Sequence, residues 1–313
     1  MSFENLMQKA AQIRAKAHSL AQVDVPPGID DPILHQGIVE ETRRRAAGVP
    51  ATFEPFTGLP DPAKFDSGIG DLSRAMDRLG TGQDTSDPIS SGLPFATAKP
   101  VLEAIDDVKT DIAEWSGKAA HEFRTNFLRP LPAIIKNQFL LVAALRSVLL
   151  MEQAMWKAAR DDIVSIADTT YNRLDSLYAF DSDDAVVVLT VTASLIGVAA
   201  ATGSGSVGVL LAVLGGTSSA WADIVGLGAP VPTQITGRKV TEVIGSMERA
   251  VQLLTVKIVE TEEKLAQAVM SISNQVHEAQ MSSDPNNQRF CARRPALANS
   301  SEGTIRHDMG YSD

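Results

Sequence analysis

Three glycines are the residues of this sequence whose spacing most suggests chemistry: Gly203, Gly205 and Gly208 form a Gly-x-Gly-x-x-Gly pattern. They follow a β-branched run, and Asp223 comes twenty residues after the first of them. In a dinucleotide-binding loop such glycines let the backbone approach a pyrophosphate at a helix N-terminus. That loop requires parallel βαβ units around it, and no second or third unit is found on either side. We therefore interpret the glycines as a flexible turn.

Other groups that could catalyse a reaction or bind a metal are scattered along the chain. The five histidines lack metal-ligand spacing, and there is no His-Glu-x-x-His motif or His/Cys cluster. Cys291 is the single cysteine and lies in a polar tail, while Ser204 and Ser206 are out of register with a Gly-x-Ser-x-Gly nucleophile motif. The acidic run 181–184 lacks the ligand spacing of an EF-hand. The sequence thus predicts a non-enzymatic protein with no cofactor and no metal.

The composition favours an all-α fold. Hydrophobic residues make up 44% of the 313 residues but aromatic residues only 5%, which suits helix-on-helix packing better than a sandwich or barrel. A net charge of -10 argues against nucleic acid as a partner. A single cysteine excludes an intrachain disulfide. Residues 1–23 carry charges throughout, unlike a secretory signal peptide.

The first predicted segment, residues 1–95, combines an N-terminal helix with a Pro/Gly-rich irregular region. Apolar residues recur every three or four positions in 1–23, which predicts an amphipathic helix packed on a bundle, with contact to a membrane surface as the alternative. Short helices are predicted near 36–47 and 69–79. The first of these carries three consecutive arginines, 43–45, which we interpret as a solvated helix face or as a docking patch for an acidic partner.

Three long helices are predicted, at 100–116, 118–178 and 237–280. In the first and third, apolar residues recur at alternating steps of four and three, as in a coiled-coil seam. The second is interrupted near Pro130 and Pro132, and its middle is apolar on nearly every side. A helix of that kind must be surrounded by other helices or by a partner chain. Self-association is expected because the seams are numerous and the chain has few elements to cover them.

The bend between the first two long helices has Trp115 on the last turn of the first helix and Gly117 directly after it. A glycine after a helix can adopt the left-handed conformation that ends it. The Trp is interpreted as a lid on the hairpin core or as an anchor for another protein. Near the end of the second helix, Tyr171 and Asp175 lie one turn apart and therefore share a helix face.

In this order the four residues resemble the WXG superfamily, small helical hairpins exported by actinobacterial and related type VII secretion systems. Members carry a Trp-x-Gly bend and a Tyr-x-x-x-Asp/Glu signal near the end of the second helix, which "WSG" and "YNRLD" match here. The resemblance covers residues 96–180. It implies a composite secretion signal read by the secretion ATPase, with those roles falling on Trp115, Gly117, Tyr171 and Asp175. It also implies a helical partner protein, or self-association, and contact with the type VII secretion machinery.

The segment 181–232 is almost free of charge and has the glycine turn near its middle. Each arm beside the turn is shorter than the roughly 20 residues that span a bilayer as an upright helix. We interpret the segment as the buried centre of the helical bundle, or alternatively as a hairpin, 185–222, that inserts in a bilayer. The β-branched start leaves both helix and strand open for 185–200. The turn that would enter the membrane consists of Gly203, Gly205 and Gly208.

The sequence therefore predicts an elongated all-α bundle built on a Trp-x-Gly helical hairpin with a central apolar hairpin. Its five segments are the N-terminal region 1–95, the WXG-like hairpin 96–180, the apolar hairpin 181–232, a long amphipathic helix 233–280 and a disordered tail 281–313. The expected function is that of a non-enzymatic type VII secretion substrate or accessory protein acting through protein–protein contacts. The alternative is a membrane-active, pore-forming-like effector. The expected location is secreted or in the cell envelope by a route independent of a signal peptide, or the cytoplasm if the chain is not exported.

Overall fold

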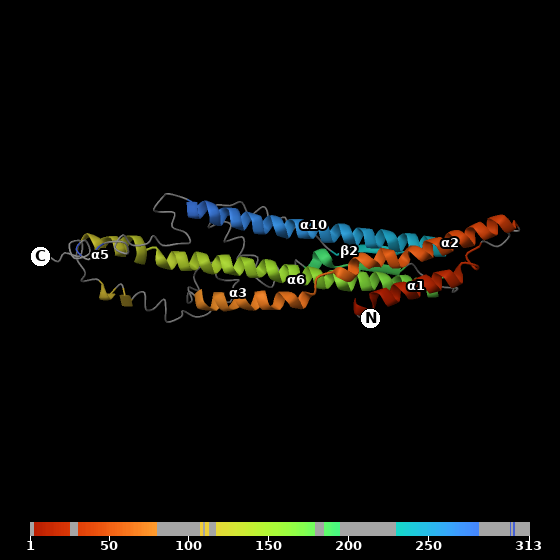
Figure 1. The fold of residues 1–313 in the computed structure, drawn as a ribbon, viewed down its shortest axis with the longest axis horizontal. Helices are drawn as coiled ribbons and strands as arrows, with labels where there is room; N and C mark the ends of the chain where they lie inside the picture. The colour runs from red at the N-terminus through yellow and green to blue at the C-terminus, as the bar shows by residue number, and fades with distance from the viewer. Residues whose placement is uncertain are drawn as a thin grey trace. The chain divides into compact units, whose positions relative to one another are not determined.

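The fold is that of a computed structural model. The described residues are 3–25, 31–79, 107, 108, 110–112, 117–178, 185–194, 230–281, 301 and 303. Within them helices dominate, and two short strands form a sheet (Figure 1). The prediction of a mainly helical fold is thus confirmed at this coarse level, with the small sheet as an addition to it. The predicted tail, apart from Met281 and two isolated positions, lies outside the described residues, as does most of the predicted helix 100–116.

The chain divides into two compact units, each assembled from separate stretches of sequence. Unit 1 contains residues 1–65, 151–197 and 224–264, and unit 2 contains residues 66–150, 198–223 and 265–313. The five predicted segments, by contrast, are consecutive along the chain. Elements far apart in sequence therefore meet within each unit, a feature that the periodicity of a single helix cannot indicate.

The predicted N-terminal helix is present in unit 1. A 3-10 turn, η1 (Phe3–Asn5), leads into α1 (Leu6–Leu20). Its apolar side chains at steps of three and four are at most 2% exposed: Leu6, Ala10, Ile13 and Ala17. α1 packs against α2 (Pro32–Phe53) within the unit (Figure 1). This apolar face therefore lies in a helical core.

α2 is longer than the predicted helix 36–47, because residues 32–35 and 48–53, predicted to be irregular, are helical. The helix begins at Pro32 after Asp31, whose side chain accepts a hydrogen bond from Ile33 N at 2.9 Å. It continues through Pro50 to Phe53. A seam at steps of three and four runs past the proline and is at most 5% exposed: Val39, Thr42, Ala46, Val49 and Phe53. Burial of this seam outweighs the one backbone hydrogen bond that the proline removes.

Two 3-10 turns, η2 (Glu54–Gly58) and η3 (Pro62–Phe65), follow in unit 1 and lead to α3 (Asp66–Leu79) in unit 2. The predicted helix near 69–79 is thus confirmed. α3 packs against the part of α6 (Leu131–Asp175) that belongs to unit 2. Arg146 Nε donates to Ser73 Oγ at 2.8 Å, and a Cβ atom at Gly68 would lie 3.2 Å from Leu149 Cδ1. The small residue lets the two helices approach closely.

The long helix predicted for 118–178 is present, with the expected interruption. α5 (Lys118–Phe123) continues as a π-helical turn (Arg124–Leu128), and α6 begins after Pro130. The wider turn is closed by Arg129 N donating to Arg124 O at 2.9 Å. None of residues 141–150 is exposed. By length and composition Asn137–Asp175 is the one described helix that could cross a membrane, a test that the core helix of a bundle also passes.

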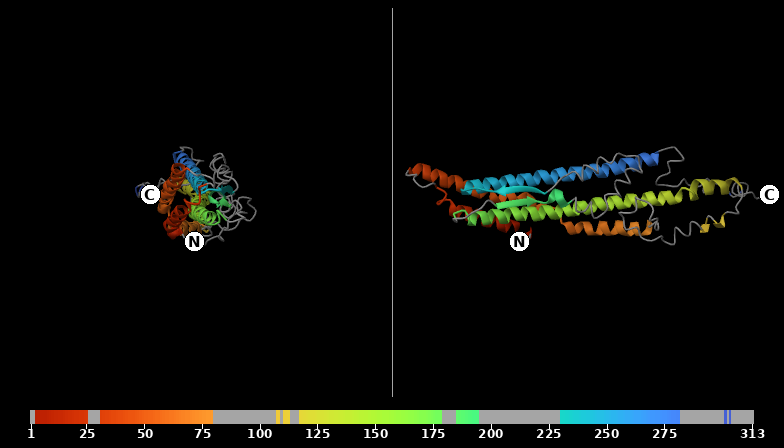
Figure 2. Two further views of the ribbon diagram at one scale, coloured as in Figure 1. Left: turned by 90° about the vertical axis from the view of Figure 1, so that its right-hand side faces the viewer. Right: turned by 180° about the vertical axis from the view of Figure 1, so that it is seen from behind.

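The start of the predicted apolar hairpin is a strand. β1 (Ala185–Leu189) pairs antiparallel with β2 (Val231–Ile235) in unit 1, with Ala185 opposite Ile235 and Leu189 opposite Val231 (Figure 2). The β-branched run explains the strand. Of the two alternatives that the sequence left open for 185–200, helix or strand, residues 185–189 form the strand. One face of β1 is buried, while Val186 is 56% and Val188 47% exposed. The rest of the predicted arms, 195–229, lies outside the described residues.

The third long helix, α10 (Val240–Met281), confirms the prediction for 237–280. Every residue of its predicted seam is at most 7% exposed: Met247, Val251, Leu254, Ile258, Thr261, Leu265, Ala268 and Ile272. The helix begins three residues later than predicted because Gly237 has a φ of +151°. A Cβ atom there would lie 2.7 Å from both Glu242 Cβ and Val243 N. Only glycine fits this turn.

Candidate functional site

The predicted signal residues Tyr171 and Asp175 lie on the last turns of α6, and the helix ends at Asp175 itself. The two side chains follow one another at i and i+4, as the sequence predicts, and Asp168 precedes Tyr171 by three positions. Tyr171 is half-buried, whereas the Asp175 side chain is 61% exposed. We call Asp168, Tyr171 and Asp175 the acidic face of α6. It belongs entirely to unit 1.

Two lysines of α1 contact the acidic face. Lys9 Nζ lies 2.8 Å from Asp168 Oδ1 and 4.2 Å from the centroid of the Tyr171 ring. Lys16 Nζ donates to Asp175 Oδ1 at 2.5 Å, and this hydrogen bond raises the pKa of Lys16 above its usual value. The Lys9 side chain is only 13% exposed. The N-terminal helix therefore forms part of the surroundings of the predicted signal.

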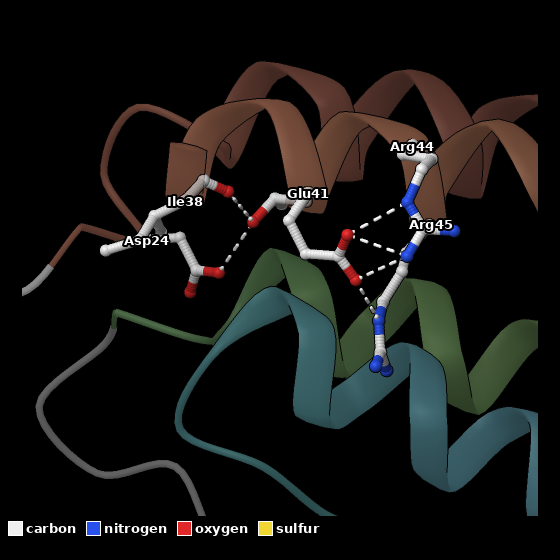
Figure 3. Close-up of polar contacts among 6 residues, drawn as sticks. Asp24, Ile38, Glu41, Arg44 and Arg45 are labelled. Atoms are coloured by element: carbon white, nitrogen blue, oxygen red, sulfur yellow. Dashed lines mark hydrogen bonds and ion pairs between the residues drawn. The ribbon is translucent and has the colours of Figure 1, made fainter. Parts of the chain in front are cut away.

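The chain just after α1 carries a buried carboxylate, Asp24, which is 4% exposed. It accepts hydrogen bonds from Val240 N at 2.8 Å and from the hydroxyls of Tyr178 and Thr42 at 3.3 Å each. Thr42 also donates to Ile38 O, and Figure 3 shows Asp24 beside Ile38 of α2. Burial, and then the charge of Asp24, raise the pKa of Tyr178. This Asp24 cluster ties α1 to α2, to the end of α6 and to the start of α10.

A second buried contact joins α6 to the turn before α10. Arg173 is 5% exposed, and its Nη2 donates to Gly237 O at 2.7 Å. Arg173 lies between Tyr171 and Asp175 in sequence but points into the unit, while Asp175 remains exposed. Because Arg173 points into the unit, Tyr171 and Asp175 on either side of it point outward, toward α1.

Two of the three arginines in the run on α2 share one carboxylate of their own helix. Both Arg44 and Arg45 donate to the Glu41 carboxylate, at distances of 2.7 to 2.9 Å (Figure 3). These hydrogen bonds lower the pKa of Glu41. An open cavity of about 590 Å³ lies alongside, and its charged lining consists of Glu41, Arg45, Glu242 and Arg249. Two acids balance two bases there, so the cavity carries no net positive charge that would favour an acidic partner.

The start of the apolar segment is held to α6 by Asp162, which is 3% exposed. Its carboxylate accepts hydrogen bonds from Thr190 N at 2.7 Å, Thr190 Oγ1 at 2.9 Å and Val191 N at 3.1 Å. Burial raises the pKa of Asp162 although these hydrogen bonds oppose the shift. The contact fixes the point at which β1 ends.

The other predicted site residues lie apart from this face or outside the described residues. Gly117 belongs to unit 2, precedes α5 and has a φ of +92°, a conformation that favours glycine. It directly precedes the second helix of the predicted hairpin, while the predicted end of the first helix lies outside the described residues. Trp115 lies outside the described residues, as does the predicted turn of Gly203, Gly205 and Gly208.

Sequence reasoning missed Lys9, Lys16 and Asp168. One signal was available: the two lysines are seven residues apart, and so are Asp168 and Asp175. The pairing itself is not visible in one sequence, because Lys16 and Asp175 are separated by 159 positions. Asp24 and Asp162 were also missed, since a buried aspartate that accepts from backbone N–H groups has no sequence pattern of its own.

The described residues hold no group of three or more His, Cys, Asp or Glu side chains that could bind a metal ion. Comparison of the chain with protein-family models, with curated proteins and with solved structures finds no match.

Proposed function

We propose that the protein is a non-enzymatic type VII secretion substrate or accessory protein that acts through protein–protein contacts. The observation that carries this proposal is the exposed end of α6. There Tyr171 and Asp175 share one accessible face, and the helix stops at Asp175. The WXG resemblance assigns a secretion signal to a tyrosine and an acidic residue in this order and at this place in the second helix.

The geometry is suited to recognition by another protein. A half-buried tyrosine offers an aromatic surface at low cost in conformational entropy, and an exposed carboxylate offers a directional acceptor. Gly117 supports the other half of the resemblance, because its positive φ permits a sharp bend directly before α5. The part of Trp115 in the proposed signal rests on the sequence resemblance alone. In this proposal the export machinery or a helical partner binds the face, and no bond is made or broken.

The test is fractionation of actinobacterial cells that produce the tagged full chain. The extracellular and envelope fractions are compared between a strain with type VII secretion and an isogenic strain without it. The proposal predicts that export depends on the system and that Tyr171→Ala and Asp175→Ala each trap the protein in the cytosol. Equal distribution in both strains would refute it.

We propose membrane activity as a second candidate, because β1 and β2 bring the two ends of the apolar segment together. Leu189 pairs with Val231, so the two ends of the 41-residue segment from 190 to 230 lie close together. A segment anchored in this way can enter a bilayer without displacing the helices that hold its ends. Val186 and Val188 add an exposed apolar surface at its start. The two functions are compatible.

Dye release from liposomes tests the second candidate. The wild-type chain should release dye, and Val186→Asp with Val188→Asp should reduce the release because both charges would lie on the exposed face of β1. Val186→Thr with Val188→Thr is the control, since it keeps the β-branched shape of both side chains and adds no charge. No release by the wild-type chain from anionic or zwitterionic vesicles would refute membrane activity.

A further inference from the structure

α1 and α6 are joined by two ion pairs that repeat after one heptad. Lys9 pairs with Asp168 and Lys16 with Asp175. Position numbers rise together on both helices, so α1 and the end of α6 run parallel over this stretch. Pairs at seven-residue spacing between parallel helices are the charge pattern with which coiled-coil partners select one another. Here both partners belong to one chain.

Lys9 holds the Tyr171 ring in a defined position. Its ammonium lies 4.2 Å from the ring centroid, a distance at which a cation attracts the ring face, and Asp168 fixes the same ammonium at 2.8 Å. Because the Lys9 side chain is only 13% exposed, this contact is partly shielded from water. One face of the ring is therefore occupied within the protein, and the exposed remainder is what another molecule can contact.

Lys16 orients Asp175 without burying it. The Lys16 ammonium donates a hydrogen bond to Asp175 Oδ1, and the Asp175 side chain remains 61% exposed. Among the described residues no other side chain pairs with Asp175, so Oδ2 is available as an acceptor. The two lysines and two aspartates compensate one another in charge.

The position of α1 is fixed at both ends. At its start, the Arg160 guanidinium lies 4.4 Å from the centroid of the Phe3 ring. At its end, Asp24 accepts hydrogen bonds from three separate elements. Between them runs the buried apolar stripe of α1. Because α1 is held in this way, it is a constant part of the site and does not move away from Tyr171 and Asp175.

From these contacts we propose that the signal is a composite of two helices supplied by one chain, with Lys9 and Lys16 as positioning residues for Tyr171 and Asp175. This inference rests on the proposed function. α1 takes the place that a separate helical partner would otherwise fill beside the signal. Because the face is neutral, the partner binds through the exposed part of Tyr171 and a hydrogen-bond donor to Asp175 Oδ2, and its affinity depends only weakly on salt.

The experiment compares four full-length variants in cells with an active type VII system: Lys9→Met, Lys9→Arg, Arg14→Met and Tyr171→Ala. Lys9→Met keeps the chain length and apolar stem but loses the cation, and the exported fraction should fall about fivefold, the effect of one moderate cation–π contact. Lys9→Arg should restore export, because a guanidinium also binds a ring face and a carboxylate. Arg14→Met removes an exposed cation from the same helix and should leave export unchanged.

Thermal unfolding of each purified variant separates positioning from folding. Lys9→Met and Lys9→Arg should unfold at nearly the same temperature, so a difference in export between them reports on the site. Export of Lys9→Met at the wild-type level, with Tyr171→Ala trapped, would overturn the composite signal and leave the proposed function standing. Increased export of Lys9→Met would also overturn it, because α1 would then be a cover. Normal export of Tyr171→Ala would overturn both proposals.

Discussion

Asp24 and Asp175 both connect α1 or its flank to the rest of unit 1, and they do so in opposite ways. Asp24 is 4% exposed and accepts from a backbone N–H and two hydroxyls. Asp175 is 61% exposed and accepts from one lysine. A buried carboxylate with neutral donors is costly to disturb, whereas an exposed ion pair contributes little to stability. The first contact holds the fold, and the second leaves its carboxylate largely exposed to water.

The largest effect is expected for Asp24→Ala. The substitution leaves Val240 N–H and the Tyr178 hydroxyl without their acceptor inside the unit, while the Thr42 hydroxyl keeps Ile38 O. We expect a loss of about 3 kcal/mol in the free energy of unfolding. Urea denaturation measures it. The control is Asp31→Ala at the exposed cap of α2, with an expected loss of about 1 kcal/mol. Equal losses would show that the Asp24 cluster is no more than an ordinary cap.

The second-largest loss of stability is expected for Gly237→Ala, because the buried Arg173 donates a hydrogen bond to the carbonyl oxygen of Gly237. The positive φ and the 2.7 Å approach to Val243 N leave no room for a methyl group. We expect a loss of about 2 kcal/mol in the free energy of unfolding. Gly48→Ala is the matched control, since nothing lies within 4 Å of its Cβ and the helix propensity of Ala should stabilise α2 by up to about 1 kcal/mol. A neutral Gly237→Ala would contradict the described turn.

Asp162 should add a pH dependence. Burial raises its pKa in the folded chain above the usual 3.8, so the folded chain holds the proton more tightly than the unfolded chain. The free energy of unfolding therefore decreases as the pH rises from 3.8 through the raised pKa, by at most about 1.4 kcal/mol per pH unit for one proton. Asp162→Asn should lack this component in urea titrations across that range. An unchanged slope would exclude Asp162 as its source.

The smallest effect on stability is expected for Lys16→Met. Its ion pair is exposed to water, so the free energy of unfolding at neutral pH should decrease only slightly. Because Asp175 raises the pKa of Lys16, the contribution of the pair is present below pH 10.5 and is lost as the pH rises through the raised value. Unfolding curves recorded below and above this range check the sign. A clear loss of stability at neutral pH would place Lys16 with Asp24 among the residues that hold the fold.

The long helices could be predicted because their signals are local. The α10 seam repeats within one element, and the break before α6 coincides with Pro130. The length of α2 was underestimated because a proline such as Pro50 normally ends a helix. Here the burial of Phe53 stabilises the helical residues after the proline. The β-branched run left a strand open for 185–200, but the sheet itself was not predicted, because the partner strand β2 lies more than forty residues away.

The site could be predicted only in part. Sequence spacing alone places Tyr171 and Asp175 on one helix face. It cannot show that Lys9 lies over the Tyr171 ring, or that Arg173 turns inward between them, because both depend on which elements meet within unit 1. The contacts that position the face come from distant parts of the chain.

One measurement tests most directly whether the end of α6 is a recognition surface. It is the extracellular fraction of full-length Tyr171→Ala relative to Asn172→Ala in cells with an active type VII system, with unfolding of both proteins recorded. Asn172 is the exposed neighbour of Tyr171 in sequence and is not part of the acidic face. Loss of export for Tyr171→Ala alone, at equal stability, is the predicted result. Equal export of both variants would contradict a recognition role for this face.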